Sequence, residues 1–370
     1  MHVVIVGAGI AGLCTAFELR SRGVRVTLCD PDPAGGASHA AAGMLAPAAE
    51  IVWGQDRLHQ MMADSAQLYP ELVARVQQAT GATVAYRQNP TMVVAAEAAD
   101  RQALAELEEV RHRLGLPTQM LLGSQARRRE PALAGNIAGA LVFPEDHQVD
   151  PRSLTGILIE HFGQDLIREQ VSEVEHCGAT ARVHTQTGRV LEADQVLLAT
   201  GLGQVPGTPR LPLRAVHGDI LRLHLPAHLR PLLTHTVRGV VHRRNVYLVP
   251  RSDGSIVLGA SSREDGNDLV SVEALYTLLD DARRLVPGIM DASLREVIAR
   301  PRPGTPDDRP IIDRVDAHTV VSNGFFRHGV LLAPLGARIA SDLLLGADPG
   351  THRGLLGLHR FPVAASSTSR

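Results

Sequence analysis

HVVIVGAGIAGLCTAFELRSRGVRVTLCD, residues 2–30, is the stretch from which we predict the fold. Its apolar, β-branched residues 3–6 are typical of a buried parallel strand. The apolar spacing of residues 10–22 predicts a helix, and residues 24–29 predict a second strand. A strand, a glycine-rich turn, a helix and a second strand in this order indicate a Rossmann-like α/β unit.

The turn between the first strand and the helix carries three glycines in the G-x-G-x-x-G spacing. We expect Gly7 to form the tight turn, Gly9 to let the backbone approach a pyrophosphate, and Gly12 to let the helix pack closely on the strand. Asp30 ends the second strand, where an acidic residue accepts a hydrogen bond from the adenosine ribose. The stretch therefore predicts a dinucleotide site, and by itself it leaves NAD and FAD equally open.

Composition narrows the class of protein. The 370 residues are enough for two domains, and no apolar run approaches the roughly 20 residues that a membrane-spanning helix needs. A net charge of −2 gives no reason to expect a nucleic acid or a membrane surface as partner. The three cysteines, Cys14, Cys29 and Cys177, are scattered, so we expect no disulfide framework, no metal site and a reducing, cytoplasmic location.

The chain contains no lysine, so arginine supplies all of its permanent side-chain cations. The absence of lysine excludes a Schiff base to pyridoxal phosphate and the P-loop type of phosphate site. We therefore expect arginine to bind any anionic ligand that needs a permanent side-chain charge.

Residues 37–47 read ASHAAAGMLAP and follow the second predicted strand after a turn-rich loop. One interpretation is a plain alanine-rich helix. The other is a loop whose small side chains let a flat ring system lie against the backbone, with Met44 and Leu45 as its walls. The segment by itself leaves both interpretations open.

Further along the chain, strand-like runs predict a second, mainly antiparallel sheet, covered by an amphipathic helix at residues 271–285. These runs are residues 219–225, 237–242, 246–249 and 256–258. Residues 196–201 predict a buried strand that rejoins the nucleotide sheet and ends in Ala-Thr-Gly. A helix predicted to begin near Leu335 would point its positive end at whatever the preceding loop holds. If that is a flavin, this end would favour the anionic reduced ring.

Several motifs occur in the same order as in the D-amino-acid oxidase/glycine oxidase superfamily of flavoproteins, which the chain resembles from its first residues to about Gly346. They are the unit at residues 7–30, AAAGMLAP at 40–47, ATG at 199–201, RPGT at 302–305 and RHGVLLAP at 327–334. The AAGML loop and the closing RHGVLLAP are most similar to those of the glycine oxidases of thiamine biosynthesis.

The resemblance implies an α/β fold, α+β overall, with two domains. A Rossmann-like FAD-binding domain would comprise residues 1–84, 148–212 and 299–360. A substrate domain with a mainly antiparallel sheet would comprise residues 85–147 and 213–298, followed by a tail at 361–370.

The glycine motif and the resemblance together imply that FAD is bound non-covalently by residues from both ends of the chain. These residues are Gly7, Gly9, Ile10, Ala11, Gly12, Asp30, Pro31, Ala37, Ser38, Ala42, Gly43, Met44, Val171, Thr200, Gly201, Phe325, Phe326, Arg327, His328, Gly329, Val330 and Leu331.

The resemblance also implies how a substrate binds. Arg302 should form a bidentate pair with the substrate carboxylate, Tyr247 should donate its hydroxyl to the same group, and Arg327 and Met44 should lie close by. No residue needs to act as acid or base, because positioning in a dry pocket lowers the barrier to hydride transfer. The implied reaction is oxidation of glycine, sarcosine or small D-amino acids by O2 to an oxo acid, ammonia and hydrogen peroxide. By analogy we expect a homo-oligomer, a tetramer.

Some positions depart from the pattern of the superfamily. Asp30 stands where glutamate is frequent, and Asn245 stands where relatives can carry histidine. Ser261 and Ser262 replace a bulkier side chain, which leaves the size limit of the pocket open. With no lysine, and no cysteine after Cys177, we do not expect the lysine-dependent oxygen reaction or the covalent FAD of related sarcosine oxidases.

Other interpretations stay open at the level of sequence. The chain could be a flavin dehydrogenase that passes electrons to a quinone, a non-catalytic flavin-binding module, or an NAD-dependent enzyme. Arg302 could lie in a surface turn, Arg327 could form a structural ion pair, and Tyr247 could be a strand residue capped by water.

Overall fold

A computed structural model describes residues 1–51 and 54–361 of the chain. Its six-stranded sheet is parallel except at one edge strand, which pairs antiparallel with its neighbour. In spatial order the strands are β19 (Ile311–Arg314), β20 (Thr319–Asn323), β13 (Gln195–Leu198), β1 (His2–Val6), β2 (Arg25–Cys29) and β9 (Leu166–Ile167). The predicted Rossmann-like order of β1, helix α1 (Ile10–Ser21) and β2 is therefore confirmed, as is the return of β13 to the sheet beside β1.

The glycine turn has the geometry that its spacing predicts. Gly7 has φ +103°, and a Cβ atom there would lie 2.3 Å from the carbonyl oxygen of Ala199. A Cβ atom on Gly12 would lie 2.0 Å from the carbonyl oxygen of Gly7, so only glycine lets α1 pack this closely. Gly23, with φ +77°, follows the end of α1.

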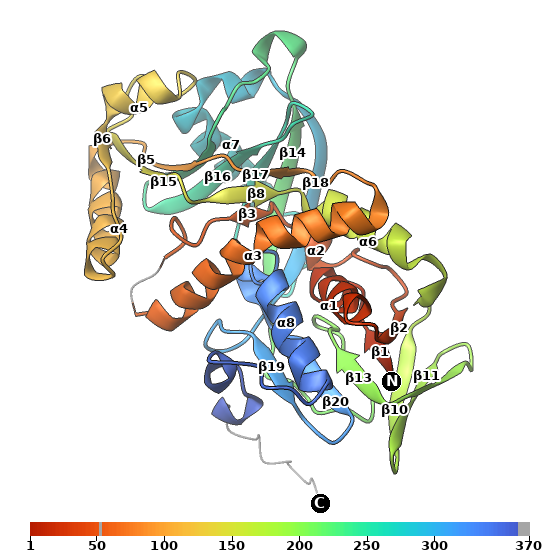
Figure 1. The fold of residues 1–370 in the computed structure, drawn as a ribbon. Coiled ribbons are helices and arrows are strands. Elements are labelled where there is room, and N and C mark those ends of the chain that lie inside the picture. The colour runs from red at the N-terminus through yellow and green to blue at the C-terminus, as the bar shows by residue number, and fades with distance from the viewer. Residues whose placement is uncertain (52–53, 362–370) are drawn as a thin grey trace, which may run out of the picture.

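The second large sheet has eight strands, and all neighbouring pairs are antiparallel except β15 with β5. In spatial order the strands are β18 (Ser293–Gly304), β14 (Arg214–His224), β17 (Ser255–Gly259), β16 (Arg244–Pro250), β15 (Thr236–Val241), β5 (Thr91–Ala95), β7 (Gly139–Phe143) and β6 (Met120–Leu122). In Figure 1 this sheet occupies the upper half and the six-stranded sheet the lower half, with α3 (Asp56–Thr80) between them. The prediction of a mainly antiparallel second sheet is confirmed.

Two small sheets complete the strand inventory of the described residues. One contains β10 (Val171–Cys177), β11 (Thr180–Thr185) and β12 (Val190–Ala193), and the other contains β3 (Met44–Leu45), β8 (His147–Val149) and β4 (Tyr86–Arg87).

Helices cover both large sheets. Against the six-stranded sheet, α1, α3, α6 (Pro151–Phe162) and α8 (Ala333–Leu344) form one apolar core with β1. The eight-stranded sheet is covered by α4 (Arg101–Arg113), α5 (Gly123–Arg129) and α7 (Val272–Leu285). The short 3-10 turns are η1 (Ala98–Asp100), η2 (Gly163–Asp165), η3 (Ala227–Leu229), η4 (Pro287–Asp291), η5 (Phe326–His328), η6 (Arg353–Leu355) and η7 (Leu358–Arg360).

Three local features differ from the sequence predictions or sharpen them. Only α2 (Ala37–Ala40) of the small-residue segment is helical, because the chain then turns into β3, so the interpretation as one alanine-rich helix is wrong. Helix α8 begins at Ala333, two residues earlier than expected. Strand β18 lies in the second sheet over its whole length, so the predicted domain boundary at residue 299 falls inside it.

The predicted tail, residues 361–370, lies outside the described residues except for Phe361. In residues 1–51 and 54–361, none of the helices combines the length and the apolar character required to cross a membrane.

Candidate active site

A cavity of about 390 Å³ extends from the glycine turn of the six-stranded sheet to the inner face of the eight-stranded sheet. Most of the residues predicted to bind a cofactor or substrate line it, although they come from five separate parts of the chain. They are Gly7, Gly9, Ile10, Ala11, Asp30, Ala37, Ser38, Ala42, Gly43, Met44, Thr200, Gly201, Tyr247, Arg302, Phe325, Phe326, Arg327, Gly329 and Val330.

The remaining predicted residues lie outside the cavity lining. Gly12 packs against the backbone of the glycine turn, and Pro31 is exposed. Val171 and Leu331 are buried in apolar clusters, and the carbonyl oxygen of Leu331 accepts a hydrogen bond from a serine of α3. His328 is buried. Cofactor contacts by these five residues stay predictions.

The glycine end of the cavity is lined with hydrogen-bond donors and acceptors. The N-cap residue of α1, Gly9, has no side chain, so the first turn of the helix opens toward the cavity. Ser38 accepts a hydrogen bond from the backbone N–H of Ile10 at 3.0 Å. Asp30 accepts hydrogen bonds from the N–H groups of Ala8, at 2.6 Å, and Asp32, at 2.9 Å. A carboxylate offers about four acceptor sites, so two remain for ribose hydroxyls.

The small-residue loop is fixed by its backbone and by a buried guanidinium. Gly43 has φ +71°, and a Cβ atom there would lie 1.9 Å from the carbonyl oxygen of Val149. Arg251 donates hydrogen bonds to the carbonyl oxygens of Ala42 and Val149 and to the amide oxygen of Gln148. Burial lowers the pKa of Arg251 to about 10. The loop is therefore a rigid wall with almost no side chains, as a planar ring system requires.

Arg302 lies on β18 at the other end of the cavity, not in a surface turn. Gly218 on the neighbouring strand makes room for it, since a Cβ atom there would lie 2.1 Å from Nη2 of Arg302. The Nη1 atom of Arg302 donates a 3.3 Å hydrogen bond to the carbonyl oxygen of Ser261. No carboxylate oxygen of the described residues lies within 4.0 Å of the guanidinium nitrogens of Arg302. Burial lowers the pKa of Arg302. A desolvated guanidinium without a counter-ion is a site for an anion.

Tyr247 and Arg327 complete this end of the cavity. The hydroxyl of Tyr247 has no hydrogen-bond partner among residues 1–51 and 54–361, and burial raises the pKa of this phenol. A Cβ atom on Gly259 would lie 2.5 Å from the hydroxyl. Arg327 forms no ion pair within the described part of the chain. Its Nη2 atom donates to the hydroxyl of Ser262 at 3.3 Å, and its guanidinium lies 4.9 Å from the ring centroid of Phe326.

Four charged residues that line the cavity were missed at the level of sequence, namely Asp32, Glu50, Arg238 and Arg300. Glu50 pairs with Arg238, and its Oε2 lies 3.3 Å from Nδ1 of His328. Burial opposes ionisation of Glu50, but its contacts with Arg238 and His328 outweigh it and lower its pKa to about 2. Glu50 and Arg238 belong to no recognisable motif, and only folding brings them together beside His328 of the closing motif.

Arg300 is another of these missed residues. It also lines the cavity, and its Nε atom donates to the carbonyl oxygen of Gly35 at 3.1 Å. Its spacing from Arg302 was a usable signal, because residues two apart on a strand face the same side.

The arrangement fits a dinucleotide at one end and a small carboxylate at the other. Acceptors and an open helix N-terminus stand at the glycine end, a side-chain-poor wall follows, and an uncompensated guanidinium with a phenol hydroxyl stands at the far end. Among the described residues there is no group of three or more His, Cys, Asp or Glu that could hold a metal ion.

Comparisons with known proteins agree with this geometry. A family model described as FAD dependent oxidoreductase (DAO) matches residues 2–343. The "Bifunctional protein ThiO/ThiG" of Trichormus variabilis is 31% identical over 99% of this chain and 56% of its own length, so the chain spans about half of that relative. The "Glycine oxidase" of Geobacillus kaustophilus is 29% identical over 92% of each chain. A crystal structure of glycine oxidase from that organism matches with a TM-score of 0.87 and 27% identity, covering 97% of this chain and 98% of the other.

Proposed function

We propose that this chain, which belongs to the family of FAD dependent oxidoreductases, oxidises glycine and other small amino acids with O2. The observation that carries the proposal is the Arg302 guanidinium, half-buried at the cavity end without a carboxylate partner among the described residues. Relatives named glycine oxidase and the match to a glycine oxidase structure support the same substrate. Sarcosine and small D-amino acids share the carboxylate and amine that such a site would recognise.

The residues of the cavity take distinct roles in this reaction. Bound FAD supplies a two-electron acceptor for the hydride of the substrate Cα–H bond. Arg302 holds the carboxylate in a charge-assisted pair, and Tyr247, kept protonated by burial, donates its hydroxyl to the same group. Arg327 adds positive charge beside them. Glu50 stays ionised and paired with Arg238, so it is not a general acid near neutral pH. Orientation then lowers the barrier without an acid or base.

The proposal extends to the residues that hold FAD. The pyrophosphate would lie at the N-terminus of α1, the adenosine ribose at Asp30, and the ring system against residues 42–44. The two large sheets would be the cores of a cofactor domain and a substrate domain. A cytoplasmic location, a homo-oligomer and a role in thiamine biosynthesis belong to the same proposal, the last because of the relatives named ThiO.

Purification and a peroxide assay test the proposal. We expect a yellow protein with a flavin spectrum, which an NAD-dependent enzyme would lack. Glycine should bleach the flavin without oxygen and release hydrogen peroxide in air. Bleaching without peroxide would instead support a dehydrogenase with another electron acceptor, and the absence of bleaching by any amine would support a flavin-binding module.

A further inference from the structure

The segment at residues 261–263 carries the hydrogen-bond partners of both substrate-facing arginines. The carbonyl oxygen of Ser261 accepts from Arg302, and the hydroxyl of Ser262 accepts from Arg327, each at 3.3 Å. Both distances are at the long end of the hydrogen-bond range, and neither guanidinium forms an ion pair within the described residues. The positions of the two guanidiniums therefore depend on where this segment lies.

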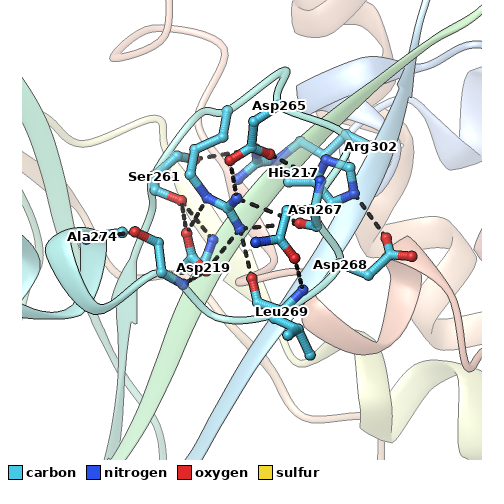
Figure 2. Close-up of polar contacts among 11 residues, drawn as sticks. His217, Asp219, Ser261, Asp265, Asn267, Asp268, Leu269, Ala274 and Arg302 are labelled. Atoms are coloured by element: carbon cyan, nitrogen blue, oxygen red, sulfur yellow. Dashed lines mark hydrogen bonds and ion pairs between the residues drawn. The ribbon is translucent and has the colours of Figure 1, made fainter.

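A buried carboxylate helps to hold the segment in place, beside two backbone hydrogen bonds between His217 and Arg263 at 2.7 and 3.0 Å. Asp219 has no exposed surface, and its oxygens accept hydrogen bonds from the hydroxyl of Ser261 and from Nε and Nη2 of Arg263, at 2.9 and 3.2 Å. Its own N–H donates to the hydroxyl of Ser261 at 2.8 Å, and the N–H of Ser271 donates to its carboxylate at 3.1 Å. Figure 2 shows Asp219 and Ser261 next to each other on the left of this cluster.

The opposite side of Arg263 reaches the rest of the loop. Its guanidinium donates to the carboxylate of Asp265 at 2.6 Å and to the carbonyl oxygen of Leu269 at 2.9 Å. Asp265 is about half exposed, with 48% of its side-chain surface accessible. The Asp265 pair is therefore the weaker, solvent-screened side of the cluster, and the Asp219 pair is the buried side.

Asp219 does not line the cavity. On β14, the preceding residue Gly218 faces the cavity and the guanidinium of Arg302, so Asp219 points to the other side of the strand. Asp219 therefore acts on a ligand through the segment that it holds and through its negative charge, which also favours the charged form of Arg302.

We propose that Asp219 is a positioning residue for substrate binding, because it fixes residues 261–263 and through them Arg302 and Arg327. Burial opposes ionisation of Asp219, but the hydrogen bonds from Arg263, Ser261 and Ser271 outweigh it and keep its pKa below the usual range. That the ligand is an amino-acid carboxylate rests on the proposed function.

The test compares Asp219→Asn with the FAD-loaded wild type and with Asp265→Asn as a matched control. The amide of Asp219→Asn keeps the shape but replaces one acceptor oxygen with a donor, which faces the donors of Arg263 and Ser261. Asp265→Asn removes the other carboxylate from the same guanidinium. Acetate is the probe of the carboxylate site, titrated against the absorbance of the bound flavin, and KM and kcat for glycine, FAD content and Tm are measured beside it.

We expect Asp219→Asn to raise both the Kd of acetate and the KM of glycine by about tenfold or more, with kcat changed by less than about threefold. Asp265→Asn should stay within about twofold of wild type in both constants. Ser261→Ala, which keeps the carbonyl but loses the hydroxyl bridge, should shift the same constants by roughly threefold. If Asp219→Asn does not fold, Ser261→Ala is compared with the wild type and Asp265→Asn in its place.

An unchanged Kd of acetate in folded, FAD-loaded Asp219→Asn or Ser261→Ala would overturn the proposal. So would a loss of kcat and Tm with KM unaltered, because a purely structural role predicts that pattern. A wild type that binds acetate yet oxidises no amine contradicts the proposed oxidase function instead, and the acetate comparison between variants still decides whether Asp219 positions the anion site.

Discussion

Arg302→Ala tests the anion site most directly. The variant removes a half-buried guanidinium from β18, at a point where no carboxylate of the described residues forms an ion pair with it. Removing one partner of a buried, hydrogen-bonded charge pair costs about 2–5 kcal/mol. At about 1.4 kcal/mol for each factor of ten, kcat/KM for glycine should fall roughly 30-fold to several-thousand-fold. An arginine on an exposed turn would contribute less than about 1 kcal/mol, a loss below about sixfold.

The thermal stability of the variant should not fall together with its activity. Arg302 pays a desolvation cost in the free protein, and its removal leaves no carboxylate unpaired. We therefore expect an unchanged or higher Tm and a full complement of FAD. Arg302→Lys keeps the charge but loses the planar fork, so its kcat/KM should lie between those of the wild type and Arg302→Ala.

Steady-state peroxide production with glycine gives kcat/KM, and thermal unfolding followed by flavin fluorescence gives Tm. Arg338→Ala is a suitable control, since Arg338 pairs with Glu71 at the surface and lies outside the cavity. The reasoning is refuted if Arg302→Ala keeps kcat/KM within about sixfold of wild type. A lower Tm would also contradict it, because that result would make Arg302 a structural residue.

Three further predictions concern the surroundings of this site. Gly218→Ala should raise the KM for glycine roughly tenfold or more with FAD retained, since its Cβ atom would lie 2.1 Å from Nη2 of Arg302; a normal KM would contradict this clash. Arg300→Ala should raise the Kd of FAD about tenfold or more, because this cation lines the cavity beside the small-residue loop. Fluorescence titration of the apoprotein with FAD measures this Kd. An unaltered Kd would exclude Arg300 from the cofactor site. Burial raises the pKa of Asp146 to about 8. Between about pH 4 and about pH 8, the Asp146 carboxyl therefore binds more protons in the folded protein than in the unfolded chain. Because of this difference, Asp146 makes the free energy of unfolding decrease as pH rises. Asp146→Asn should flatten that decline in urea unfolding at about pH 5 and about pH 9, and equal slopes for the two proteins would argue against the shift.

Local sequence signals predicted the nucleotide half of the fold. The positive φ of Gly7 and the close packing at Gly12 follow from their spacing after a buried strand, because few other residues can satisfy both constraints. Helix α6 begins with Asp150 as its N-cap and Pro151 at its first position, and the Asp150 side chain accepts a hydrogen bond from the N–H of Arg152. Such features depend on neighbours within a few residues along the chain, so they can be predicted from the sequence.

Contacts between distant segments were harder to predict. Glu50 and Arg238 are separated by 188 residues and meet only because the small-residue loop packs against the second sheet. The boundary placed at residue 299 falls within β18 because a strand can extend from one functional region into another without any break in its pattern. Arg300 was overlooked beside Arg302 although both share a face of β18.

By itself the sequence determined the Rossmann-like unit, the second antiparallel sheet and, through its motifs, the residues from which a flavin and substrate site could be assembled. Periodicity, glycine spacing and the absence of lysine are properties of the chain that need no partner in space. Only the tertiary structure decided that Arg302 lines the cavity without a counter-ion, that Glu50 forms an ion pair with Arg238, and that Asp219 helps to hold the segment contacting both arginines. Burial and charge compensation are sums over neighbours from the whole chain, so they exist only once the chain has folded.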